Sequence, residues 1–179
     1  MKKHFPFILV ILLFTVACSP KISEQQEGNL NQLTLKVDSS VAILLAIDSA
    51  EMMQMGNEFE KMKKTLLNDI KDTLSPETVF YLDSFVNLKK PMAFITSKYR
   101  PLKEEALIVQ QQMKDLTQDV ENRLVDEEHF EKYYRLEQEN YLQLEEAVGQ
   151  FDRAYTVSKR RFNNMKSKVD SIISATTND

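Results

Sequence analysis

Glycine, cysteine, histidine and tryptophan are all scarce in this chain of 179 residues. It contains three glycines, one cysteine, two histidines and no tryptophan. So few glycines argue against a fold of many tight turns, and the abundant Leu, Lys, Glu and Gln favour long helices. A single cysteine excludes a disulfide within the chain, so stability has to come from packing. The shortage of thiol and histidine argues against a catalytic triad.

The first twenty residues have the layout of a secretory signal. Lys2 and Lys3 precede an apolar run from Phe5 to Ala17, which ends in small residues around Cys18. This apolar core has about 13 residues, whereas a permanent membrane-spanning helix needs roughly 20. We therefore expect residues 1–17 to be a cleaved signal peptide rather than an anchor helix.

The residues Thr15-Val16-Ala17-Cys18 resemble the lipobox of bacterial lipoproteins, although the family usually has Leu or another aliphatic residue where Thr15 stands. In that family the cysteine is acylated on its sulfur, the signal is cut before it, and the new amino terminus is acylated. The resemblance implies lipidation of Cys18 and a membrane anchor in the cell envelope. Ser19 resembles outer-membrane sorting signals, while the face of the membrane stays open. The alternative for a lone cysteine is a buried, inert thiol.

Acidic residues outnumber basic ones by 27 to 23, which gives a formal net charge of −4. Cleavage before Cys18 removes Lys2 and Lys3, so the mature chain has 21 basic and 27 acidic residues and a net charge of −6. Because an acidic surface repels phosphate backbones, we expect no nucleic-acid partner.

Residues 18–30 hold the cysteine and a polar stretch with Gly28 and no apolar period, which predicts a flexible tether. From Val41 to Leu66, apolar residues recur at steps of three and four, with Asp48 as the polar member of the stripe. This spacing predicts one helix that ends near Thr73.

A second helix is predicted to start at Ser75-Pro76-Glu77, because a hydroxyl can cap it and proline suits its first position. It should end before Pro91. Its apolar side consists of Val79, Leu82, Phe85 and Val86. Between Pro91 and Pro101 we expect a kinked helical turn or an ordered connector. After Pro101 the helical spacing resumes at Leu102, Ala106, Val109, Met113, Leu116 and Val120.

The boundary between the last two helices falls at residues 122–126. The apolar register crosses it without slipping, as it would in one unbroken helix. We favour a turn, because Asn122 suits a helix C-terminus and Asp126 can cap a new helix. The last helix, from Glu127 to Ser174, would be roughly 70 Å long. Its stripe, with Ser158 as the one polar member, comprises Tyr141, Leu144, Val148, Phe151, Tyr155, Phe162, Met165, Val169 and Ile172.

Such a long stripe needs a partner surface of similar length. Short connections make neighbouring helices antiparallel, so the helices on either side of residues 122–126 should form a hairpin. The predicted fold is an all-α, elongated antiparallel bundle of three to four long helices with coiled-coil-like packing, over residues 31–179. Stripes of this kind also pair between chains, so self-association stays open.

The lipobox, the Met-rich segment Ile47–Gly56 and the terminal helical hairpin together resemble small helical lipoproteins of Bacteroidetes whose activity is unassigned. The resemblance spans most of the chain but includes no diagnostic motif. Some of those proteins have His-Asp where Asp48-Ser49 stand here, so it implies no functional residue.

Metal binding has two weak candidates. His129 follows Asp126 at a spacing that could put two ligands on one helix face, but the second histidine of a di-iron bundle is absent and a solvated histidine is favoured. Met52, Met53 and Met55 could bind Cu(I) through their thioethers. Methionines at helical spacing are more often core residues, so we expect no metal and no other cofactor.

Three other features have a structural and a functional interpretation. Asp48 either lines a cleft or is solvated where the helix has rotated, and we favour the second. Four tyrosines either line a groove or belong to an aromatic core with hydroxyls at its rim, and we favour the core: Tyr133, Tyr134, Tyr141 and Tyr155. The run Lys159-Arg160-Arg161 is either a solvated face, which we favour, or a docking patch for an acidic partner or lipid headgroup.

The sequence therefore predicts a non-enzymatic, lipid-anchored envelope protein whose bundle acts as a scaffold or binds another envelope protein. No residue is predicted to be catalytic. The alternative is a ligand-binding bundle that holds a soft metal, haem or a lipid around Met52, Met55 and Asp48.

Overall fold

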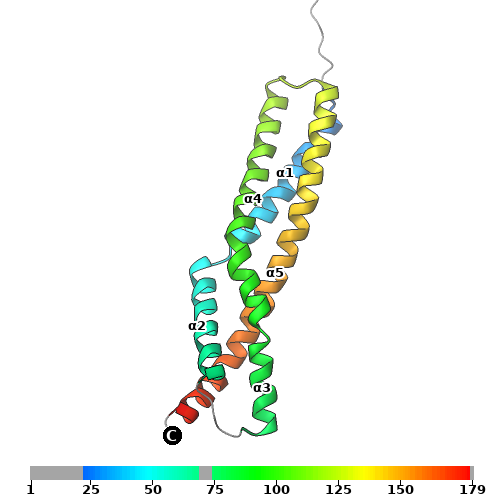
Figure 1. Ribbon diagram of the computed structural model, residues 1–179. Helices are drawn as coiled ribbons and strands as arrows, with labels where there is room; N and C mark the ends of the chain where they lie inside the picture. Colours follow the sequence, from blue (N-terminus) through cyan, green and yellow to red (C-terminus); the bar gives the residue numbers. More distant parts are fainter. Residues whose placement is uncertain (1–21, 69–73, 178–179) are drawn as a thin grey trace, which may run out of the picture.

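The computed structural model describes residues 22–68 and 74–177. Over these residues the chain forms five helices and no strand: α1 (Glu24–Leu45), α2 (Ser49–Asn68), α3 (Pro76–Val86), α4 (Lys89–Glu121) and α5 (Glu127–Thr177). α1 and α2 follow one another along a rod, α3 and α4 return in the opposite direction, and α5 runs back beside them (Figure 1). The predicted all-α antiparallel bundle is confirmed.

α5 is the longest element and the common partner of the others. Its 51 residues span about 75 Å at a rise of 1.5 Å per residue. α1 and most of α4 pack on its first half, and α2, α3 and the start of α4 pack on its second half (Figure 1). The core positions predicted for α5 are confirmed: seven are buried, and Met165 and Ile172 are partly buried against the same core.

The turn predicted at residues 122–126 is also confirmed, and the unbroken helix is excluded. The backbone N–H of Leu124 bonds to the carbonyl of Asp119, and that of Arg123 bonds to Val120, which is the pattern of a Schellman motif. Arg123 occupies the left-handed position, with φ 58°. The carboxylate of Asp126 then accepts the backbone N–H of His129 at 2.9 Å and caps α5.

α1 begins at Glu24, so the predicted flexible tether is wrong for residues 24–30. The Ser23 hydroxyl accepts the backbone N–H of Gln26, and the Gln26 side chain accepts the backbone N–H of Ser23. This capping box satisfies two backbone donors and fixes the start of the helix. The predicted signal peptide and Cys18 lie outside the described residues.

The apolar stripe of α1 explains why the helix extends so far upstream. Leu30 and Leu33 are buried and continue the three–four spacing back from Val41. Burial of two leucines contributes about 3–6 kcal/mol, which outweighs the roughly 1 kcal/mol cost of Gly28 within a helix. The bundle domain therefore starts before residue 31.

The single helix predicted from Val41 to Leu66 is wrong, because α1 ends at Leu45 and α2 starts at Ser49. The Asp48 carboxylate accepts the backbone N–H groups of Ala50 and Glu51 at 2.9 and 3.0 Å. A capping residue has a non-helical backbone, so it ends any helix that precedes it. Leu45, four residues after Val41 in the predicted stripe, is exposed, and Leu44 is buried in its place.

The segment between Pro91 and Pro101 is helical, so the ordered connector is wrong, and it belongs to α4, which is continuous through both prolines. Pro91 is the third residue of α4, where a backbone N–H has no partner within the helix. Pro101 removes one backbone hydrogen bond, at a cost of about 3 kcal/mol. The buried side chains of Tyr99 and Leu102 continue the stripe across it and keep the helix packed.

Ser75 caps α3 as predicted, through a hydrogen bond from the backbone N–H of Thr78. Leu82 and Phe85 are buried and Val86 is half-buried, but Val79 faces solvent, which corrects its assignment to the core. The rings of Phe59, Phe85 and Phe162 join α2, α3 and α5, with centroids 5.2 and 6.1 Å apart.

Gly56 allows α2 and α4 to approach closely. A Cβ atom at this position would lie 2.6 Å from Cγ2 of Thr96. Thr96 is stiff at χ1 and its hydroxyl donates to the carbonyl of Met92, so the methyl group has no easy escape. We expect Gly56→Ala to lower the free energy of unfolding by about 1–3 kcal/mol, measured by urea titration with circular dichroism.

Two further variants control this prediction. Thr96→Ser removes the clashing methyl, so it should recover most of the loss when combined with Gly56→Ala. Gly28→Ala meets no atom within 4 Å, and it should stabilise α1 by about 0.5–1 kcal/mol. Equal effects of alanine at Gly28 and Gly56 would contradict the close contact.

The buried hydroxyl of Tyr99 holds the end of α1. It donates to the carbonyl oxygen of Leu44 at 3.2 Å and lies 3.5 Å from that of Ile47. Tyr99→Phe leaves these carbonyls without the donor, so we expect a loss of about 1–2 kcal/mol in the free energy of unfolding. Tyr133→Phe, at a 40% exposed residue, should change stability by less than about 0.5 kcal/mol. A similar effect of the two substitutions would argue against the Tyr99 contact.

Candidate functional site

The α1–α2 break divides the rod into two halves. Tyr99 reaches the end of α1 through its hydroxyl, and its ring lies 5.9 Å from that of Phe151. The break, Tyr99 and Phe151 are therefore at one level of the rod. We call residues 22–47 and 99–150 the α1 half, and residues 48–68, 74–98 and 151–177 the α3 half.

The two halves have opposite charge. The α1 half contains 16 acidic and 7 basic residues, a net charge of −9. The α3 half contains 8 acidic and 12 basic residues, a net charge of +4. The overall net charge hides this separation, because each half is assembled from distant parts of the sequence. The α3 half is therefore the part of the rod that can attract an anionic partner.

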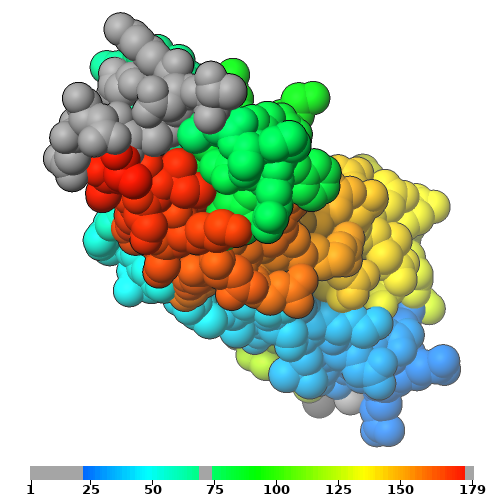
Figure 2. Space-filling model, turned by 90° about the horizontal axis from the view of Figure 1, so that it is seen from below, coloured from blue at the N-terminus to red at the C-terminus, as the bar shows by residue number. Residues whose placement is uncertain are grey.

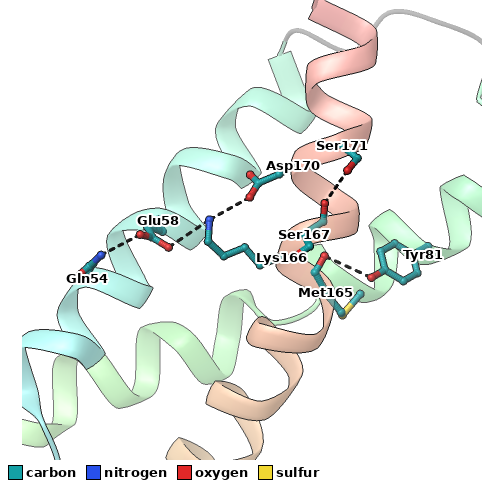
Figure 3. Close-up of polar contacts among 8 residues, drawn as sticks. All are labelled: Gln54, Glu58, Tyr81, Met165, Lys166, Ser167, Asp170 and Ser171. Carbon is teal, nitrogen blue, oxygen red and sulfur yellow. Dashed lines mark hydrogen bonds and ion pairs between the residues drawn. The ribbon is translucent and has the colours of Figure 1, made fainter.

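α3 and the last part of α5 form the end surface of the α3 half, and Figure 2 shows them side by side. The Arg161 guanidinium donates to the carbonyl of Ser84 at 3.3 Å. Nζ of Lys168 lies 4.3 Å from the centre of the Tyr81 ring, whose hydroxyl donates to the Met165 carbonyl at 3.4 Å (Figure 3). These contacts place two cations beside the exposed side of α3.

An exposed aromatic ring completes this surface. Phe80 is 75% exposed, although it lies within one helical turn of Ser84 and next to Tyr81 in sequence. The hydroxyl of Ser84 donates to the carbonyl of Phe80 at 2.9 Å. We call Phe80, Tyr81, Arg161 and Lys168 the α3–α5 patch.

The run Lys159-Arg160-Arg161 is divided between different partners rather than forming one surface. Lys159 pairs with Glu51 of α2, and this hydrogen bond raises the pKa of Lys159. Arg161 contacts α3, and Arg160 is exposed to solvent. The solvated face expected for this run is therefore confirmed for Arg160 and Arg161, which are exposed, and is wrong for Lys159, which is half-buried against Glu51.

A second ion pair joins α2 to α5 one to two turns further along. Nζ of Lys166 lies 3.0 Å from Asp170 and 3.6 Å from Glu58 (Figure 3). The hydrogen bond with Asp170, helped by Glu58, raises the pKa of Lys166. These pairs neutralise cations on the α2 side of α5, which leaves the α3 side as the more basic one.

The candidate metal ligands lie in different environments. Met52 and Met55 are buried in the core, whereas Met53 is 45% exposed. His129 lies in the first turn of α5, exposed and hydrogen-bonded to Asp126 at 2.8 Å, and its N–H groups hold the pKa of Asp126 below the usual value. No group of three or more His, Cys, Asp or Glu side chains in the described ranges is placed to hold a metal ion.

The tyrosines do not line one groove. Tyr141 and Tyr155 are buried, Tyr134 is half-buried and Tyr133 is exposed. The Tyr141 hydroxyl donates to Glu145 at 2.5 Å, and burial together with this carboxylate raises the pKa of Tyr141 to about 12. Tyr134 and Tyr141 border a small hollow of about 90 Å³ between α1 and α5. The favoured interpretation, tyrosines of the core with polar rims, is confirmed for Tyr141 and Tyr155.

The burial of the Glu137 carboxylate was not predicted from the sequence. It is only 8% exposed and accepts one hydrogen bond, from the Asn140 amide at 3.3 Å. Burial raises its pKa above the ordinary value of 4.5, while this hydrogen bond lowers it. The signal was present, because Glu137 occupies the stripe position between Tyr134 and Tyr141. Ser158, the polar residue that was noticed, is buried with no hydrogen-bond partner for its hydroxyl among the described residues.

These features define a class, an elongated all-α bundle whose two halves carry opposite charge. Comparison of the chain with protein-family models, curated proteins and solved structures finds no match. Among the residues that the structure describes, no helix combines the length and apolar character needed to cross a membrane.

Glu137 gives the stability of the fold a specific pH dependence. Its pKa is higher in the folded than in the unfolded chain, so its contribution is complete below pH 4.5 and is lost as the pH rises through the raised pKa. Glu137→Gln should therefore be more stable than the parent near neutral pH, and the difference should shrink as the pH falls toward 4.5. Urea titrations across this range measure it. Glu139→Gln, at an exposed site of the same helix, should show no such trend, and a pH-independent effect at Glu137 would contradict the prediction.

Proposed function

We propose that this chain is a lipid-anchored protein of the cell envelope whose helical rod acts as a non-enzymatic scaffold or interaction module. The observation that carries the proposal is where the rod starts. α1 begins at Glu24, six residues after Cys18, and it begins at one end of the bundle, beside the α4–α5 turn (Figure 1). A lipid on Cys18 would therefore hold the molecule by its end.

The distances support this arrangement. Six extended residues reach at most about 20 Å, so a lipidated Cys18 keeps the α1 half close to the membrane surface. α5 is about 75 Å long, so the α3 half can extend well beyond the headgroup region. A rod held by its end presents its far half to other components of the envelope.

The alternative is a bundle that binds a soft metal, haem or a lipid, and the residues on which it was based have structural roles. Met52 and Met55 pack in the core, and Asp48 caps α2 with its carboxylate. The fold uses all three residues for its own stability, so no observation favours this alternative.

Lipidation at Cys18 is tested by feeding cells an alkyne-labelled palmitate and measuring the label on the purified protein. We expect strong labelling of the parent chain, loss of the label in Cys18→Ala, and unchanged labelling in Ser19→Ala. Inhibition of the lipoprotein signal peptidase should cause a heavier precursor to accumulate. A mature protein without label, or a label that survives Cys18→Ala, would overturn the anchor.

A further inference from the structure

We infer that the α3–α5 patch binds the anionic headgroups of a second lipid surface, so that the rod bridges this surface and the membrane that holds Cys18. The inference rests on the proposed lipid anchor for its geometry. It adds a binding partner for the α3 half, which neither the lipobox nor the fold identifies.

The charges of the patch are available to a ligand. Arg161 contacts a neutral carbonyl and Lys168 contacts an aromatic ring, and neither forms an ion pair within the described part of the chain. Lys159 and Lys166, on the same stretch of α5, are both paired with carboxylates. Among the described residues, Arg161 and Lys168 are therefore cations of this stretch that no carboxylate neutralises, and the exposed Arg160 is next to Arg161 in sequence.

The apolar residues of the patch favour a lipid surface over a simple anion site. Phe80 is 75% exposed and its neighbour Val79 is 52% exposed, and both are on α3, the helix that Arg161 and Lys168 contact. Apolar side chains flanked by Lys and Arg are typical of surfaces that enter the headgroup region, since the cations attract lipid phosphates while the apolar groups leave water. The attraction is between exposed charges, so it should weaken as ionic strength rises, and the carboxylates of Glu77 and Asp83 on α3 reduce it.

The charge of the α1 half favours contact of the patch with a second lipid surface rather than with the membrane that holds Cys18. For the patch to contact the anchoring membrane, the rod would have to lie flat on it. That orientation brings the α1 half, with a net charge of −9, against anionic headgroups. An upright rod keeps most of this charge beyond the Debye length, about 8 Å at physiological salt, and directs the α3 half outward.

The inference is tested with the lipidated protein reconstituted into phosphatidylcholine vesicles. Fluorescent acceptor vesicles are then added, made either of phosphatidylcholine alone or with phosphatidylglycerol included, and the captured fluorescence is measured. We expect capture of the phosphatidylglycerol vesicles only, with the signal lost as salt is raised to about 1 M. No capture by protein that has entered the donor vesicles would overturn the inference.

Matched variants locate the contact. Arg161→Glu combined with Lys168→Glu should lower capture roughly tenfold or more, because four units of charge are changed next to the headgroups. Lys132→Glu combined with Arg135→Glu makes the same charge change on exposed residues of the α1 half and should leave capture intact. Phe80→Ser should also weaken capture. Leu124→Ser, at a 72% exposed residue of the α4–α5 turn, should not.

Three outcomes separate the explanations. Equal loss of capture in the patch and control variants would mean non-specific charge attraction and would overturn the inference. Competition by soluble polyglutamate with no capture of phosphatidylglycerol vesicles would identify an acidic polypeptide as the partner, and would also overturn it. Failure of the protein to enter donor vesicles would refute the anchor instead. The patch would then be judged by co-flotation of the same variants with phosphatidylglycerol vesicles, provided that their melting curves match the parent.

Discussion

The continuous apolar stripe of α5 is the constraint on which the rest of the structure depends. A stripe about 75 Å long cannot be left exposed, and the chain covers it with two layers that each consist of two helices placed end to end. The breaks in those layers are set by local hydrogen bonds, at Asp48 between α1 and α2 and at the turn between α3 and α4. Ring contacts join both layers to α5: Phe151 contacts Tyr99 of α4, and Phe162 contacts Phe85 of α3, whose ring also contacts Phe59 of α2.

Periodic apolar spacing predicted the parts of the fold in which one helix stays in one register. α5, the second half of α4 and the turn between them came out correctly because packing and capping signals agree there. The failures occur where these signals conflict. Asp48 fits the polar slot of a continuous stripe and also fits an N-cap, and the hydrogen bonds from Ala50 and Glu51 to its carboxylate show that the cap is used. The two prolines of α4 conflict with its apolar stripe, and the burial of neighbouring side chains outweighs them.

The candidate site was much less predictable than the fold. The sequence drew attention to the run Lys159-Arg160-Arg161 because its members are adjacent, but adjacent residues on a helix point in different directions. The patch instead combines Arg161 and Lys168, which are two turns apart, with α3 residues about 80 positions earlier. The separation of charge along the rod is equally difficult to predict from the sequence, because it depends on which stretches of the chain pack at the same level of the rod.

With the proposed lipid anchor, charge separation and end attachment would together set the orientation of the rod. A neutral rod on a short lipid tether would be free to tilt toward the membrane, whereas the negative α1 half opposes a flat orientation over an anionic leaflet. The positive α3 half would be attracted to anionic headgroups, but α5 would hold it tens of ångströms from the proposed anchor, so its attraction would act on whatever lies beyond the anchoring membrane. The rigidity of the continuous α5 helix therefore gives the electrostatic pattern a direction. A hinge in its middle would let the α3 half fold back to the anchoring surface and would remove that direction.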